Sequence, residues 1–249
     1  MKKGIDINCD MGESLDFLVS GHDEALMAFI TSVNIACGFH AGNEDIMIKT
    51  VENAQKYKLN IGAHPGFDDK ENFGRNEMSL TFEAIKVLIS TQLNILNKVL
   101  KVKGLKMKHV KPHGALYNMS AKNVEYAQAI AEAVYEFDNE LILFGLSGSL
   151  SISEAKKIGL KTYDECFADR SYMSDGSLAH RSFQNAVKAN VEEVKKQTQS
   201  LMNGSTLSTL DGEFIKINCD SICIHSDTPN ALAFAKAIYD IKITSSIGH

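Results

Sequence analysis

Short apolar runs alternate with longer helical patterns along almost the whole chain, and this alternation is the strongest constraint on its fold. Repeated strand–helix units place parallel strands side by side with the helices outside them. Seven such units in 249 residues favour one closed or nearly closed parallel (β/α) barrel over residues 1–249, with an open doubly wound sheet as the structural alternative. The predicted strands are Gly4–Cys9, Ser32–Ala36, Leu59–Ala63, Met107–Lys111, Leu141–Phe144, Leu160–Tyr163 and Ser221–Ile224.

Two helices and one hairpin can be predicted with definite bounds. Over Thr81–Val102, apolar side chains recur with the 3.6-residue period of an amphipathic helix. A second helix is predicted from about Ser182 to Met202. Residues 206–218 interrupt the alternation, because two short apolar runs flank the dipeptide Asp211-Gly212, which is typical of a type I′ turn. We therefore expect a β-hairpin inserted before the last strand.

The composition is that of a globular protein that binds neither nucleic acid nor membranes. Hydrophobic residues make up 44% of the chain and charged residues 23%, which is enough apolar surface for a sizeable core. Lys and Arg total 26 against 31 Asp and Glu, and the net charge of −5 is unlike the basic face of a phosphate-backbone binder. The longest apolar stretch, near Leu141–Leu146, is too short to span a bilayer.

The cysteines and the N-terminus indicate a cytoplasmic location. No apolar segment follows Lys2 and Lys3, so a secretory signal is not expected. The chain has five cysteines and no C-x-x-C pair, which predicts free thiols in a reducing compartment.

Polar and titratable residues recur at the carboxyl ends of the predicted strands. Parallel α/β folds build their sites there, because the strand-to-helix loops converge and helix N-termini point their N–H groups inward. On the first strand Asp6, Asn8 and Asp10 share one face, so we expect them inside the barrel, with Asp6 as a structural partner for a buried cation. The recurring residues are Asn8, Asp10 and Glu13; Asn34 and His40; His64; Lys111 and His113; Glu165, Asp169 and Arg170; and His225 and Asp227.

Asp10, His40 and His64 are candidate ligands of a divalent metal. Two histidines and a carboxylate are a common ligand set. Pro65 keeps His64 in an extended conformation, and the glycines beside His40 also suit a tight loop in which that ring has only a structural role. No compact H-x-x-E-H-type spacing supports the metal, so lining of the pocket is the alternative role for both histidines.

Two further segments have features of anion-binding sites. Arg170 follows Asp169 directly. Either the two side chains form a surface ion pair, or the planar guanidinium of Arg170 binds a carboxylate or phosphate. Thr228 and Pro229 mark a helix start after the last strand, and such an N-terminus is a candidate anion site. No G-x-x-x-x-G-K-[ST] sequence occurs, so the chain lacks the P-loop nucleotide signature.

Six motifs follow one another along the chain: DINCDMGES, NIACGFHAG, GAHPGF…NFGR, HVKPHGALYN, FADRSY..DGSL..R and CIHSDTP. In this order and spacing they resemble the LamB/YcsF family of 5-oxoprolinase A subunits, from residue 4 to about 240. The resemblance implies a seven-stranded, TIM-like barrel related to the polysaccharide-deacetylase-like superfamily. Two positions depart from the pattern, because Gly66 stands where the family usually has serine and Ser226 where it usually has glycine.

The resemblance also implies an activity, which is the ATP-dependent opening of the lactam ring of 5-oxo-L-proline to L-glutamate, together with partner subunits B and C. ATP would be used by the assembled complex, and homo-oligomerisation is left open. On this hypothesis Asp10 or Glu13 is the general base, and His113 protonates the ring nitrogen. Lys111 and Arg170 hold the negative charge of the substrate, with Lys111 as the first choice. The substrate site is predicted to include Asn8, Asn34, His40, Asp169, Arg170 and His225.

Two other functions remain open from the residues alone. One is a stand-alone, metal-dependent deacetylase or amidase acting on a small or carbohydrate substrate. The other is a non-catalytic module that binds 5-oxoproline and regulates a partner.

Overall fold

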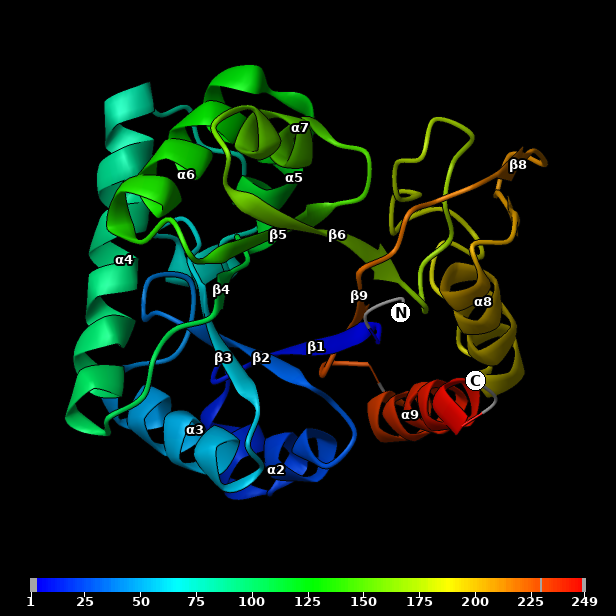
Figure 1. Cartoon of the computed structure of the whole chain (residues 1–249), viewed down its shortest axis with the longest axis horizontal. Helices are drawn as coiled ribbons and strands as arrows, with labels where there is room; N and C mark the ends of the chain where they lie inside the picture. The colour runs from blue at the N-terminus through cyan, green and yellow to red at the C-terminus, as the bar shows by residue number, and fades with distance from the viewer. Residues whose placement is uncertain (1–3, 229, 248–249) are drawn as a thin grey trace.

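Seven parallel strands close into a barrel in the computed structural model, which describes residues 4–228 and 230–247 (Figure 1). The strands follow chain order around the barrel, and the last one pairs with both the sixth and the first, with Phe167 opposite Cys223 and Asp6 opposite Ser221. The predicted closed barrel is confirmed, and the open doubly wound alternative is wrong. The barrel strands are β1 Asp6–Met11, β2 Ser32–Ala36, β3 Asn60–His64, β4 His109–Val110, β5 Ile142–Leu146, β6 Lys161–Phe167 and β9 Ser221–Ile224.

Helices surround the barrel and cover its outer face (Figure 1). The predicted helix at Thr81–Val102 is confirmed as α4 (Phe82–Val102), with Thr81 Oγ1 accepting the N-cap bond from Ala84 N at 3.3 Å. No helix in the described part of the chain is both long and apolar enough to cross a bilayer. The helices besides α4 are α1 Leu15–Val19, α2 His22–Met27, α3 Glu44–Lys56, the 3₁₀ turn η1 Lys70–Asn72, α5 Gly114–Lys122, α6 Val124–Phe137, α7 Leu150–Lys157, α8 Val191–Asn203 and α9 Ala231–Ile247.

The helix predicted over Ser182–Met202 begins later than its sequence pattern indicated. Helix α8 starts at Val191, because the Asn190 side chain accepts a hydrogen bond from Glu192 N at 2.7 Å and caps the first turn. Residues 168–190 form an irregular loop instead, which contains isolated antiparallel bridges such as the one between Tyr172 and Leu178. This loop supplies part of the wall of the cavity described below.

The predicted hairpin forms, but its turn is not type I′. The strands are β7 Leu207–Ser208 and β8 Phe214–Ile215, which pair antiparallel. A type I′ turn needs positive φ at both central residues, whereas Gly212 has a φ of +91° and Asp211 has no positive φ. The Asp211 carboxylate accepts a hydrogen bond from Ser174 Oγ at 2.6 Å, which ties the turn to the loop 168–190.

The inside of the barrel is polar, unlike the branched apolar layers usual in this architecture. On β1, Ile7 and Cys9 belong to the apolar core, whereas Asn8 reaches across the interior to Glu165 on β6. Asp6 accepts hydrogen bonds from Ser32 Oγ and Ser221 Oγ, both at 2.6 Å, so hydroxyl groups are its partners here. Burial lowers the pKa of Lys242 more than the nearby Asp6 carboxylate raises it, so a cation does lie near Asp6.

Candidate active site

Hydrogen-bonded polar side chains cross the middle of the barrel. Asn8 donates through Nδ2 to Glu165 Oε1 at 2.9 Å and to Ser221 Oγ at 2.7 Å. Asn34 donates through Nδ2 to Asn8 Oδ1 and to Asp10 Oδ1, both at 2.7 Å. Both asparagines are fully buried and use their amides in these bonds. They therefore position the two carboxylates, which differs from the substrate contact expected of them.

Lys111 places its ammonium group between two carboxylates below the barrel mouth. Its Nζ lies 2.9 Å from Glu165 Oε1 and 3.0 Å from Asp10 Oδ1, and it donates to Asn8 Oδ1 at 3.1 Å. Burial disfavours the charged form, but Asp10, Cys223 and Glu165 outweigh burial and raise the pKa of Lys111 well above its usual value. Because these contacts occupy its donors, Lys111 does not fit the expected role of meeting the negative charge of a substrate.

Asp10 stays ionised at the mouth of the barrel. Burial alone would raise its pKa, but His64 and Lys111 outweigh burial and hold the pKa of Asp10 well below its usual range. Its Oδ2 lies 3.3 Å from His64 Nε2, and its side chain is 17% exposed. A carboxylate with so low a pKa is a weak base, so Asp10 is suited to balancing charge and orienting His64.

The buried imidazoles of His64 and His113 face each other. His64 Nδ1 bonds to Lys111 O at 2.7 Å and His113 Nε2 bonds to Phe73 O at 2.9 Å, so these nitrogens carry protons because carbonyls only accept. His64 Nε2 and His113 Nδ1 then face each other at 3.0 Å. Burial lowers the pKa of His113 to about 3, whereas the Asp10 carboxylate overcomes burial and raises the pKa of His64. A proton shared between the rings therefore belongs to His64.

Glu13 lies within reach of three imidazoles. Its Oε1 is 3.2 Å from His40 Nε2, 3.3 Å from His113 Nδ1 and 3.8 Å from His64 Nε2. Burial raises the pKa of Glu13 to about 7, and repulsion from Asp10 adds to this effect. A carboxyl group with a pKa near 7 can take up and return a proton at neutral pH. Of the two carboxylates predicted as general base, Glu13 therefore has the better chemistry.

The same residues fit a metal site, but in a different combination from the predicted one. One ligand atom from each of Glu13, His40, His64 and His113 lies within 4.8 Å of the others. The rings of His40 and His113 are stacked, with centroids 3.8 Å apart and planes 5° from parallel, so they cannot both direct in-plane lone pairs at one ion. His64 and His113 do converge, each held from behind by a carbonyl as metal-ligating histidines usually are. His64 and His113 are therefore the two rings that could converge on one ion, with Asp10 or Glu13 as the carboxylate, whereas the predicted set combined His64 with His40.

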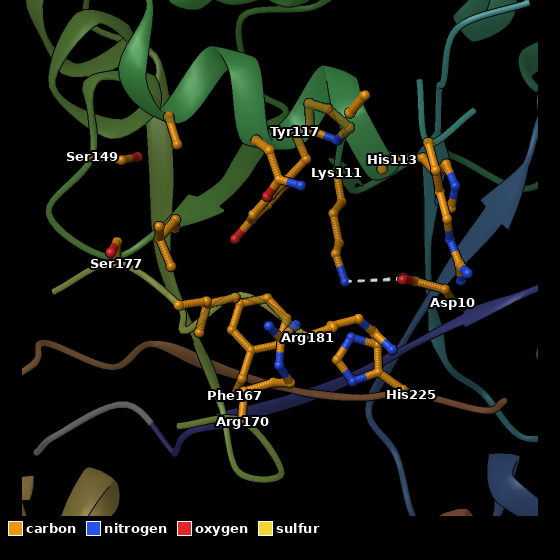
Figure 2. Close-up of a pocket in the computed structure, with 18 of the residues that line it drawn as sticks. Asp10, Lys111, His113, Tyr117, Ser149, Phe167, Arg170, Ser177, Arg181 and His225 are labelled. Atoms are coloured by element: carbon orange, nitrogen blue, oxygen red, sulfur yellow. Dashed lines mark hydrogen bonds and ion pairs between the residues drawn. The ribbon is translucent and has the colours of Figure 1, made fainter. Parts of the chain in front are cut away.

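A cavity of about 810 Å³ lies at the carboxyl ends of the strands, within the size range of ligand pockets (Figure 2). Figure 2 shows Lys111 and Tyr117 reaching toward it from one side, with Phe167 and His225 on the opposite side. The corner before α5 shapes this wall, because Gly114 has a φ of +55° and a Cβ there would lie 2.6 Å from Gly74 O. The turn at Pro112–Gly114 is therefore structural as well as part of the site.

Asp169 and Arg170 do not pair with each other. The Asp169 Oδ2 atom accepts a hydrogen bond from His225 Nδ1 at 2.8 Å, and despite burial this partner lowers the pKa of Asp169. The Arg170 Nη2 atom donates to Ala179 O at 2.7 Å. The expected surface ion pair is therefore wrong, and Asp169 instead orients His225, which lines the cavity.

Three residues of the site were not foreseen from the sequence. His109 lies on β4 and bonds through Nε2 to Asn34 Oδ1 at 2.7 Å; its position two residues before Lys111, on the same strand face, was the available signal. Tyr117 on α5 and Arg181 also line the cavity. Arg181 is the last residue of the motif FADRSY..DGSL..R, which was the available signal, but no role was assigned to it. The proposed helix start at Pro229 lies outside the described residues.

Comparison with known proteins adds a family to this geometry. The model of the LamB/YcsF family matches residues 5–247. The 5-oxoprolinase A subunit of Staphylococcus epidermidis is 45% identical over 238 residues, covering 96% of this chain and 94% of that protein. The 5-oxoprolinase A subunit of Bacillus cereus is 43% identical over 238 residues, covering 95% and 94%. The crystal structure of the lactam utilization protein from Thermus thermophilus superposes with a TM-score of 0.91 at 36% identity, covering 98% of both chains.

Proposed function

This chain belongs to the LamB/YcsF family, and on that premise we propose that it is the A subunit of a 5-oxoprolinase, a hydrolase that opens the lactam ring of 5-oxo-L-proline to give L-glutamate. The observation that carries the proposal is the position of Glu13, whose pKa of about 7 suits proton transfer, among buried imidazoles beside the cavity. The names of the relatives at 45% and 43% identity support the choice of substrate.

ATP and two partner subunits, B and C, complete the proposed reaction. A lactam is a stabilised amide, and phosphorylation of its oxygen with ATP would make the ring carbon a better electrophile. We assign that step to the partner subunits, because this sequence lacks a P-loop signature. The word "subunit" in the names of the relatives supports a multi-subunit assembly. All five cysteines are free, which supports a reducing compartment such as the cytoplasm.

In the proposed ring opening, Glu13 removes a proton from water as the water oxygen bonds to the ring carbonyl carbon. The His64 imidazolium stabilises the negative charge of the phosphorylated lactam oxygen, and Asp10 keeps that ring charged. The carbon–nitrogen bond then breaks and leaves a carboxyl phosphate, which a second water molecule hydrolyses to release inorganic phosphate. The electron pair of the broken bond goes to nitrogen, and Glu13 returns the proton there. We move this last role from His113 to Glu13, since a histidine with a pKa of about 3 is a poor proton donor near neutral pH.

A divalent metal ion is also part of the proposal. His64 and His113 would hold it as neutral imidazoles with the ionised Asp10 carboxylate, so in the metal-bound form the ion would take the place of the His64 positive charge, and Glu13 would stay free as the base. A bound divalent ion supplies Lewis-acid polarisation of a carbonyl. The stand-alone, metal-dependent amidase remains the second candidate, because the histidine cluster alone suits it equally well.

One assay separates these candidates. Glutamate formation from 5-oxo-L-proline is measured with the purified chain alone and then with subunits B and C and ATP. We expect release only in the complete mixture. Hydrolysis of an acetylated substrate by the chain alone, without ATP and abolished by a chelator, would favour the amidase. A complete mixture that turns over equally well without this chain would contradict the 5-oxoprolinase assignment.

A further inference from the structure

Arg170 is a buried cation without a carboxylate partner in the part of the chain that the structure describes. The residue is 7% exposed, and its Nε atom is buried with no hydrogen-bond partner. Its guanidinium donates from Nη2 to Ala179 O at 2.7 Å. The neighbouring Asp169 is bound to His225 instead. Burial and Arg181 lower the pKa of Arg170 overall, although Asp169 raises it through space. A buried cation without a carboxylate in direct contact is unfavourable, so this position favours the binding of an anion.

Arg181 brings a second cation to the same cavity. It is exposed on the loop 168–190, and both arginines line the cavity (Figure 2). After burial, the positive charge of Arg181 is the next cause that lowers the pKa of Arg170, so the two guanidinium groups are close enough to repel each other. Two neighbouring cations at a cavity wall are stabilised by an anion placed between them.

The other cations of this cavity are already paired. Lys111 is held by Asp10 and Glu165. Arg75 lies 3.3 Å from a carboxylate oxygen of Asp227, and Lys122 lies 3.2 Å from one of Glu77. Among the described Lys and Arg residues of the cavity wall, Arg170 and Arg181 are thus the pair available to a ligand.

We propose that Arg170 and Arg181 together bind the carboxylate of the lactam substrate and so hold its ring against Phe167, with the ring carbonyl toward Glu13 and His64. A planar guanidinium matches the two oxygens of a carboxylate, and Phe167, stacked on His225 with ring planes 15° apart, offers an apolar surface to the ring. This assignment rests on the proposed function, because it takes 5-oxo-L-proline as the substrate. It keeps the role predicted for Arg170 and transfers to Arg181 the part first predicted for Lys111.

Binding to the full-length chain, measured by titration calorimetry without ATP or partners, tests the assignment. The ligands are 5-oxo-L-proline and 2-pyrrolidone, which is the same lactam without the carboxylate. Arg170→Lys keeps the charge but loses the planar fork, and Arg181→Gln changes an exposed residue. We expect each to weaken 5-oxo-L-proline binding on the order of tenfold to a hundredfold and to leave 2-pyrrolidone binding unchanged. Arg75→Gln removes a paired cation from the same wall and should retain wild-type affinity.

Thermal melting provides a second readout that does not depend on affinity alone. Without ligand, Arg181→Gln should melt at the wild-type temperature or above it, because like-charge repulsion is relieved, while the stabilisation by 5-oxo-L-proline should shrink.

The assignment is overturned if Arg181→Gln binds 5-oxo-L-proline like the wild type, or if Arg75→Gln loses as much affinity. It is also overturned if the variants weaken the binding of both lactams equally, or if the wild-type chain binds neither lactam. Inorganic phosphate binding more tightly than 5-oxo-L-proline at these arginines would overturn it too, by assigning them to a phosphoryl group. A chain that fails to release glutamate with its partners can still pass this test, so the two proposals fail separately.

Discussion

Lys111 and Glu165 form an ion pair inside the barrel, with Nζ 2.9 Å from Oε1 and side chains 4% and 0% exposed. The pair joins the end of β4 to β6 across the interior, and the same ammonium group also contacts Asp10 on β1. The charge of Lys111 is therefore balanced within the protein, and on our proposal Arg170 and Arg181 are the cations that meet the substrate.

Replacing Lys111 with Met should destabilise the fold strongly. The change leaves Glu165 and Asp10 buried without their cation, which typically costs about 3–5 kcal/mol of unfolding free energy. Urea unfolding at pH 7 measures the loss. Adding Glu165→Gln to Lys111→Met should restore part of it, because one uncompensated charge is removed. Lys122→Met breaks an exposed pair with Glu77 and should change stability little. Similar losses from the two lysine variants would argue against a structural role of Lys111.

Glu13→Gln should lower glutamate release by about 10²–10⁴-fold in the complete assay, since the amide cannot accept the proton from water. The chain should remain folded, because the uncharged amide suits a site whose burial raises the pKa of Glu13 to about 7. The matched control is Glu77→Gln, a carboxylate on the same cavity wall that pairs with Lys122. Retention of wild-type turnover by Glu13→Gln would leave Asp10 as the remaining base candidate, to be tested with Asp10→Asn.

Metal affinity should depend on His113 more than on His40. With Zn²⁺ as the probe in calorimetry of the purified chain, we expect one ion per chain and a loss of at least about tenfold in affinity in His113→Gln. His40→Gln should lose less, because the stacked His40 ring does not direct its lone pair at the same point. Equal losses would mean that His40 rotates to ligate the ion. No binding by the wild type would remove the metal from the proposal.

Stability should fall in acid, because the folded protein holds His109 in its neutral form. Burial lowers the pKa of His109 to about 4, below the value of about 6.5 in an unfolded chain. The unfolded state thus binds more protons between these values, so stability is present above about pH 6.5 and is lost as the pH falls toward 4, by up to about 3 kcal/mol. Urea unfolding from pH 7 to 4 measures this slope.

His109→Gln should flatten that slope, since an amide can still donate to Asn34 Oδ1 but does not titrate in this range. His180→Gln, at an exposed position, should leave the slope nearly unchanged. If His109→Gln kept the full wild-type slope, other buried groups would have to account for it.

Most of the fold could be predicted because its signals are local. Each strand is a short apolar run, and the strands Ser32–Ala36 and Ser221–Ile224 have the predicted bounds. Other strand bounds differ from the prediction: β1 ends at Met11 and β6 at Phe167, beyond the predicted ends at Cys9 and Tyr163, and β4 is shorter than predicted. Two further errors have local causes. The Asn190 cap makes α8 begin at Val191, later than predicted. Asp211 does not adopt the positive φ that a type I′ turn requires.

The sequence by itself determined the barrel and the strand ends at which Asp10, Glu13, His64, Lys111 and His113 gather, because both follow from periodicity along the chain. Only the tertiary structure decided which of these groups meet. Closure of β9 between β6 and β1 brings Glu165 to Lys111, and Arg170 has no carboxylate in ion-pair contact among the described residues. Backbone carbonyls orient His64 and His113 toward each other, while His40 stacks on His113. Charge pairing and ring orientation depend on distances between residues remote in sequence, and no local pattern records those distances.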